Sequence, residues 1–112
     1  MLARRYRLSR ADFAHLMKYG RRIRTPELTL VHLAQPDALR CGVAVSKKVA
    51  KRAVDRHVLR RAVYSVFDRV HAELPPCLVA VVAQRPLAKC SRAEVRARVR
   101  EALVRAGLVD GA

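Results

Sequence analysis

The chain has 112 residues, and its 24 Lys and Arg against nine Asp and Glu give a formal net charge of +15, which favours a polyanionic partner. A hydrophobic fraction of 52% excludes a disordered basic tail and suits one compact domain with a modest core. No apolar stretch approaches the roughly 20 residues of a transmembrane helix, and none follows the basic start as in a signal peptide, so we expect a cytoplasmic protein.

The first predicted element is a helix over residues 10–19. Ser9 is a candidate N-cap, apolar residues follow it at helical spacing, and Gly20 ends the helix. The basic segment 21–25 then forms a connection or a short edge strand, which Pro26 halts.

Two predicted strands follow. Residues 27–33 are rich in Leu, Thr and Val, and residues 40–46 read RCGVAVS, a pattern typical of strands. The Gln-Pro-Asp sequence at 35–37 between them is typical of a turn. We therefore expect these two strands to pair as a hairpin.

The longest predicted helix spans about residues 51–71, and the pair Pro75-Pro76 stops it. Its helical wheel is amphipathic, so we expect one side to pack on a sheet and the other to face solvent. The apolar side consists of Leu59, Ala62, Val63, Val66 and Val70. The opposite side consists of Arg56, His57, Arg60, Arg61 and Tyr64.

The C-terminal part predicts one strand and one helix. Residues 77–83 read CLVAVVA, a nearly continuous apolar run typical of a strand that is covered on both faces. Ser91 and Glu94 predict a capping box at the start of a helix over residues 93–106, which Gly107 closes.

The element order α-β(β)-β-α-β-α predicts a small α/β sandwich with helices against a sheet and no second domain. One strand precedes the long helix and one follows it, so this unit is a βαβ crossover. Spacing alone predicts the right-handed form of that crossover.

Residues that would support chemistry are sparse. The cysteines Cys41, Cys77 and Cys90 are odd in number and form no CxxC, so we expect neither a zinc site nor disulfides, and predict that Cys41 and Cys77 are buried thiols. The glycines are dispersed, the histidines stand alone, and most acids fall at helix starts or turns. We predict no catalytic and no metal-binding residue in this chain.

The basic run from Lys47 to Arg61 is the most informative segment. Seven of its fifteen residues are Lys or Arg, and Asp55 is its only acid. Apolar residues are threaded through it, so it belongs to a folded element. Because such an element repels itself, a polyanion is its natural partner.

The stretch from Gly42 to Arg61, GVAVSKKVAKRAVDRHVLRR, resembles the signature of the protein subunit of bacterial ribonuclease P. In that family a strand ends in a small residue and a Lys-Lys pair, and the next helix carries an Arg-Asn-Arg core and then aliphatic-basic-Arg. The resemblance covers nearly the whole chain. Its matching positions are Ser46-Lys47-Lys48, Arg56 and Leu59-Arg60-Arg61, and, in the first helix region, Leu8, Asp12-Phe13 and Gly20.

The chain departs from the family pattern inside the arginine core. His57 stands where Asn is usual, Val58 stands where Arg is usual, and Tyr64 replaces a frequent basic residue one turn later. These departures affect which side chains would contact RNA, and they do not change the expectation that the helix binds it.

The resemblance implies an α+β sandwich of order α-β-β-β-α-β-α, with a four-stranded sheet, flanking helices and a left-handed βαβ crossover. It also implies a non-catalytic protein that assists an RNA enzyme in the endonucleolytic removal of the 5′ leader from precursor tRNA. The RNA would hold the catalytic Mg²⁺, and no cofactor is expected on the protein. The implied partners are ribonuclease P RNA and precursor tRNA, with one protein per RNA and no membrane.

Two surfaces are expected to bind RNA. On the basic run, Arg suits phosphate because its planar fork can bind two oxygens at once, and in the leader cleft bases would stack on aromatic residues. The phosphate-binding set is Lys47, Lys48, Lys51, Arg52, Arg56, His57, Arg60 and Arg61. The leader cleft set is Phe13, Met17 and Val31.

Other functions remain open on the sequence. A ribosomal or other structural RNA-binding protein is the main alternative, because small basic α/β domains are common in that class. A protein-only nuclease would need a cluster of carboxylates or histidines, which the sequence does not display. The RNA that co-purifies with the chain would distinguish the first two.

Overall fold

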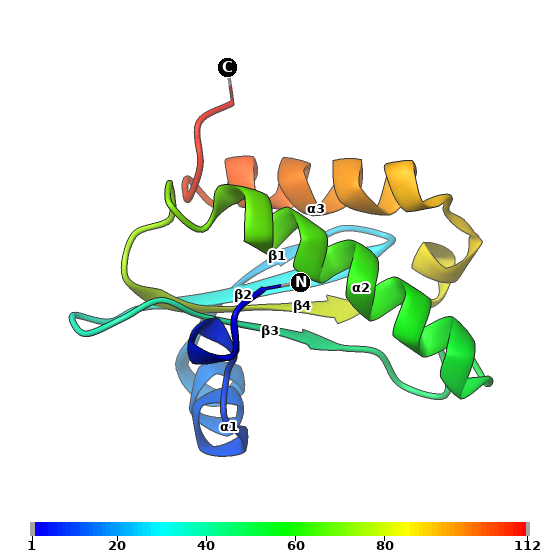
Figure 1. Ribbon diagram of the computed structural model, residues 1–112, viewed down its shortest axis with the longest axis horizontal. Coiled ribbons are helices and arrows are strands. Elements are labelled where there is room, and N and C mark those ends of the chain that lie inside the picture. Colours follow the sequence, from blue (N-terminus) through cyan, green and yellow to red (C-terminus); the bar gives the residue numbers. More distant parts are fainter. Residues whose placement is uncertain (1, 112) are drawn as a thin grey trace.

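The chain forms a four-stranded mixed sheet with helices on both faces, as the computed structural model in Figure 1 shows for residues 2–111. All of the predicted helices and strands are present, and the long helix begins two residues later than predicted. In chain order the elements are η1 (Arg4–Tyr6), α1 (Arg10–Tyr19), β1 (Arg21–Arg24), β2 (Leu28–Ala34), β3 (Arg40–Ala44), α2 (Ala53–Val70), β4 (Cys77–Ala83), η2 (Arg85–Lys89) and α3 (Arg92–Arg105).

The predicted hairpin between residues 27–33 and 40–46 is wrong. The strand order is β1-β2-β4-β3, so β2 pairs antiparallel with β1 and with β4, whereas β3 pairs with β4 in parallel. The apolar strand β4 is buried on both faces, and its position inside the sheet provides this burial because neighbouring strands flank it on both sides. The arginine-rich strand β1 lies at an edge, where its charged side chains reach solvent.

Strands β3 and β4 are joined by α2 in a βαβ crossover. In Figure 1 both strands run from left to right, with β3 nearer the viewer and α2 above the sheet, so the crossover is left-handed. This is the hand that the family resemblance implied and the opposite of the general rule. The free edge of β3 is covered in part by the N-terminal segment, where the Leu8 amide donates to the Cys41 carbonyl at 2.9 Å.

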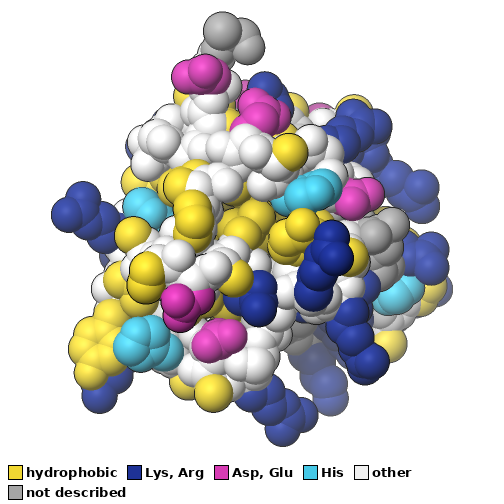
Figure 2. Space-filling model, turned by 60° about the vertical axis from the view of Figure 1, so that its left-hand side comes forward, with side chains coloured by type: hydrophobic (Ala, Val, Ile, Leu, Met, Phe, Trp, Pro, Cys, Tyr) yellow, Lys and Arg dark blue, Asp and Glu magenta, His cyan; other side chains and the backbone are white. Residues whose placement is uncertain are grey.

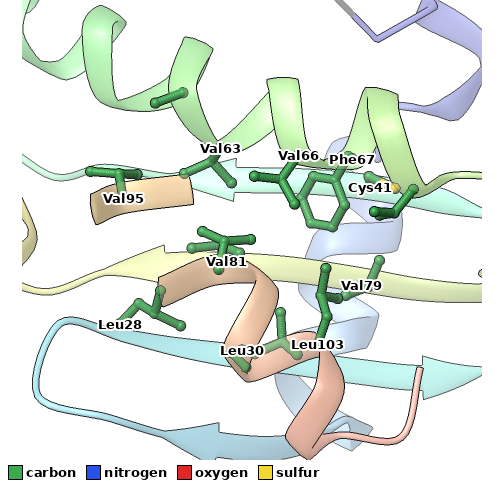
Figure 3. Close-up of a cluster of buried hydrophobic side chains, with 14 of the residues drawn as sticks. Leu28, Leu30, Cys41, Val63, Val66, Phe67, Val79, Val81, Val95 and Leu103 are labelled. Atoms are coloured by element: carbon green, nitrogen blue, oxygen red, sulfur yellow. The ribbon is translucent and has the colours of Figure 1, made fainter. Parts of the chain in front are cut away.

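Helices α2 and α3 cover one face of the sheet and form the larger core. Figure 3 shows Val63, Val66 and Phe67 of α2 pointing toward the sheet, where they meet Val79 and Val81 of β4. Burial of each such side chain contributes about 1.5–3 kcal/mol. The predicted apolar side of α2 is confirmed, since all five of its residues are buried.

Helix α1 covers the opposite face and forms a second, smaller core with β2 and β4. Leu16 is fully buried against Val31, Leu78 and Ala80. Gly20 permits this close packing, because a Cβ there would lie 2.6 Å from Cγ1 of Val31. The C-terminal end of α1 therefore packs closely against β2.

Side-chain caps begin the first and last α-helices as predicted. The Ser9 hydroxyl accepts from the Asp12 amide at 3.1 Å, and Ser91 and Glu94 form the reciprocal capping box. Cys41 and Cys77 are buried as predicted, and burial raises the pKa of their thiols to about 12 and about 11.

The start of α2 is held differently, because its N-cap, Arg52, makes no side-chain hydrogen bond. Instead the Arg56 guanidinium turns back and donates to the carbonyls of Ala50 at 3.0 Å and Lys51 at 2.7 Å. Arg56 therefore ties the basic loop to the first turn of the helix. On the helical wheel, Arg56 lies with the residues expected to face solvent, so the sequence does not reveal that it also binds these backbone carbonyls.

We expect Arg56→Ala to lower the free energy of unfolding by roughly 1–2 kcal/mol, because two backbone acceptors lose a charged donor. Arg60→Ala is the matched control, since Arg60 lies one turn later, is similarly half-buried and makes no such bond among the described residues. Urea unfolding of both variants measures the difference. Equal stability of the two would show that the Arg56 bonds do not hold the loop.

Candidate nucleic-acid interface

Four of the predicted phosphate-binding residues lie in the loop between β3 and α2. Lys47, Lys48, Lys51 and Arg52 are all exposed and precede the first helical residue, Ala53. The loop therefore gathers their charges around the N-terminus of α2, where the helix dipole is itself positive.

The other four predicted residues lie on α2 and are less uniform. His57 and Arg61 are exposed, whereas Arg56 and Arg60 are half-buried. Arg61 is turned toward α3, where it lines a hollow with Arg92 and Arg96. The eight residues thus lie in the loop and in the first half of α2, where they spread over two sides of the helix.

Ion pairing leaves most of this charge unneutralised. Within residues 2–111, the one ion pair of the basic run joins Arg52 Nε to Asp55 Oδ2 at 3.7 Å. Both side chains are largely exposed, and such a pair contributes at most about 1 kcal/mol. Six Lys and Arg of the run therefore remain without a carboxylate partner in that part of the chain, which is the electrostatic pattern of a polyanion site.

The opposite end of the molecule differs in character. Figure 2 is turned toward the left-hand end of Figure 1, away from the N-terminus of α2. Acidic, histidine and hydrophobic side chains are scattered over that view, and most Lys and Arg project along its right and lower margins. On this face, the basic side chains therefore gather toward the margins.

Two of the departures from the family motif are accommodated by packing. Tyr64, which we expected on the solvent side of α2, is half-buried against the larger core, and burial raises its pKa. The Arg7 guanidinium lies 5.4 Å from the centre of the Tyr64 ring, so a cation from the N-terminal segment occupies this position. Val58 is half-buried and lines the hollow beside Arg61.

The predicted leader cleft is only partly accessible. Phe13 and Met17 are half-buried on the flank of the smaller core, and Phe13 borders a hollow of about 280 Å³ that Tyr64 also lines. Val31 is 0% exposed beneath α1, so its side chain supports the cleft and does not reach its surface.

Sequence reasoning missed a larger hollow of about 680 Å³ at one edge of the sheet. Arg24, Lys48 and Arg85 line it, and the hydroxyl residues Thr29 and Ser46 lie among them. The carboxyl ends of β1, β3 and β4 meet at this edge because the three strands run in the same direction. With the correct strand order, the basic residues at or just after the end of each of these three strands would have indicated this hollow.

No helix among residues 2–111 is both long and apolar enough to cross a membrane. Over that range, no group of three His, Cys, Asp or Glu side chains is placed to hold a metal ion.

Known proteins resemble this chain in both sequence and fold. The ribonuclease P family matches residues 2–107. The ribonuclease P protein component of Microcystis aeruginosa is 32% identical over 108 residues, which cover 91% of this chain and 90% of that protein. The component of Pasteurella multocida is 34% identical over 85 residues, or 73% of this chain and 70% of that protein.

Solved structures agree in fold. The ribonuclease P protein of Staphylococcus aureus superposes with a TM-score of 0.87 at 23% identity, over 94% of this chain and 98% of that one. The protein from Thermotoga maritima gives 0.77 at 24% identity, over 88% and 96%. The sequence matches carry the assignment, and the fold is consistent with them: the chain belongs to the ribonuclease P protein family.

Proposed function

We propose that this protein component of the ribonuclease P endoribonuclease binds the RNA subunit through the basic loop at 46–52 and the exposed cations of α2. The observation that carries the proposal is the group of unneutralised Lys and Arg side chains at the N-terminus of a helix that is docked on the sheet. Phosphate groups of a folded RNA would neutralise this charge, and release of their counterions would supply affinity.

Cleavage of the phosphodiester bond, and the Mg²⁺ that it needs, belong in this proposal to the RNA subunit. The protein contributes by reducing the repulsion between two polyanions, the catalytic RNA and precursor tRNA. Residues 1–112 would act as one RNA-binding domain, with one copy per RNA, in the cytoplasm where precursor tRNA is made.

The 5′ leader of precursor tRNA would lie along the hollow beside Phe13 of α1 and the hollow at the carboxyl edge of the strands. Phe13 and Met17 offer an apolar flank there, and Arg24, Lys48 and Arg85 offer cations at the carboxyl edge of the strands. Few aromatic side chains are available, since the chain has two Phe and three Tyr. We therefore propose that leader recognition depends more on charge than on base stacking.

The proposal is tested by 5′ processing of precursor tRNA at a Mg²⁺ concentration chosen so that ribonuclease P RNA alone gives little product. We expect the parent protein to restore processing. The triple variant Lys47→Gln, Lys48→Gln, Lys51→Gln should need at least about 10-fold more protein to reach the same processing rate, because about three phosphate contacts are lost. The matched control Arg4→Gln, Lys89→Gln, Arg105→Gln removes the same charge from exposed positions elsewhere and should behave like the parent protein.

Two outcomes would overturn the proposal. An unrelated protein of comparable charge could restore processing equally well, which would reduce the effect to nonspecific screening. Alternatively, the purified protein could cleave precursor tRNA without the RNA subunit, which would place the chemistry in this chain.

Phe13 is tested separately by its effect on leader recognition. We expect Phe13→Ala to weaken binding of precursor tRNA with a leader by only about 3- to 10-fold relative to tRNA without one, because one stacked base contributes about 1–3 kcal/mol and Phe13 is half-buried. Binding of both tRNAs to the reconstituted holoenzyme measures this ratio. An unchanged ratio in a stably folded variant would remove Phe13 from the leader site.

A further inference from the structure

Five arginines line the groove between α2 and α3, on a part of the surface that the family signature touches only at Arg61. Two hollows of about 210 and 170 Å³ lie along this helix pair and share Arg96. The arginines are Arg61 and Arg69 of α2 and Arg92, Arg96 and Arg100 of α3.

The row on α3 follows from helical spacing. Arg92, Arg96 and Arg100 recur at every fourth position, so they lie on one side of the helix at intervals of about 6 Å along its axis. Val99 and Leu103 are fully buried against the core and fix the rotation of the helix. The position of these three arginines beside α2 is therefore fixed by the packing of a rigid helix.

The carboxylates of α3 are engaged elsewhere. Glu94 closes the capping box with Ser91, and Glu101 accepts from Arg98 at 3.2 Å. Arg98, on the other side of the helix, also pairs with Glu27 at 3.7 Å. Over residues 2–111, no ion pair joins a carboxylate to any of the five groove arginines.

The floor of the groove is apolar, with Val58, Val66 and Ala97 among its lining residues. Arg96 is half-buried and the other four arginines are exposed, so their guanidinium groups are accessible to an anion that lies along the groove. All five cations are Arg, whose planar forks bind phosphate oxygens in pairs, whereas three of the four loop cations are Lys.

We propose that this arginine groove is a second RNA-binding surface, which binds the phosphate backbone of ribonuclease P RNA next to the region contacted by α2. The inference rests on the proposed function and extends the RNA interface onto α3, with Arg61 common to both surfaces. A membrane fits the groove less well, because Tyr19 and Val54 are the only large apolar side chains exposed among residues 2–111 and neither lines it.

The triple variant Arg92→Gln, Arg96→Gln, Arg100→Gln tests the proposal by its salt dependence. Loss of three phosphate contacts should reduce the slope of log K against log salt for ribonuclease P RNA by about 2–3, with an affinity loss of about 10-fold or more. The control is again Arg4→Gln, Lys89→Gln, Arg105→Gln, which removes the same net charge and should change the slope by less than about 1.

The outcomes separate this inference from the proposed function. The two triple variants could show equal salt slopes while the parent protein still prefers ribonuclease P RNA to a ribosomal RNA fragment of equal length. That result would overturn the role of the groove and leave the proposed function standing. A parent protein without that preference would overturn the proposed function and the groove with it. A groove variant that loses binding only to phosphatidylserine vesicles would also overturn an RNA role.

A proximity measurement covers the case in which the groove variant folds poorly. An iron–EDTA probe attached at Ala97→Cys, in a Cys90→Ser background, should cleave ribonuclease P RNA at sites near those cut from Val54→Cys. The thiols of Cys41 and Cys77 are buried and should stay unlabelled. Cleavage from position 97 that is no stronger than from the control Ala34→Cys, which is exposed at the opposite end of the sheet, would overturn the proposal.

Discussion

The apolar side of α2 packs on the sheet, and the arrangement of the basic residues depends on that contact. Two like charges about 8 Å apart in water repel by roughly half a kcal/mol, and salt reduces this further. The run contains many such pairs, but α2 buries six side chains, and each one as large as Val or Phe contributes about 1.5–3 kcal/mol. Docking therefore exceeds the self-repulsion of the basic run, and the cations are presented in one orientation by a stable scaffold.

The topology of the sheet gives the molecule its separate surfaces. Because β4 is apolar on both faces, helices can cover the sheet on both sides, with α2 and α3 on one and α1 on the other. The parallel directions of β1, β3 and β4 bring three basic segments to one edge. The loop between β3 and α2 starts at that edge, so Lys48 belongs both to the proposed leader path and to the proposed contact with the RNA subunit.

Much of this fold could be predicted from local sequence signals. Ser9 and Ser91 mark helix starts because their hydroxyls accept from nearby amides, and the run CLVAVVA indicates a strand covered on both faces. The hairpin prediction failed because closeness in sequence does not reveal that β4 inserts between β2 and β3. The left-handed crossover likewise came from the family resemblance and not from a spacing rule.

The site was predictable where it is local and was missed where it depends on packing. The basic run is visible in the sequence, whereas the bonds of Arg56 to the carbonyls of Ala50 and Lys51 require the turn of the chain before α2. Tyr64 carries a hydroxyl and was placed with the cations, but its ring packs inward beside Arg7. The arginine groove forms only when α3 lies beside α2.

The most direct measurement compares the full chain with an isolated peptide of residues 46–71, which carries the same basic run without the sheet. We expect such a peptide to be largely unfolded in water, because most of the stability of a helix in a protein comes from tertiary packing of its apolar side. If docking creates the interface, the peptide should bind ribonuclease P RNA and a ribosomal RNA fragment with equal, weak affinity, while the full chain prefers the former. A peptide that discriminates between the two RNAs as well as the full chain does would show that charge alone is sufficient and that the docked helix is not the basis of recognition.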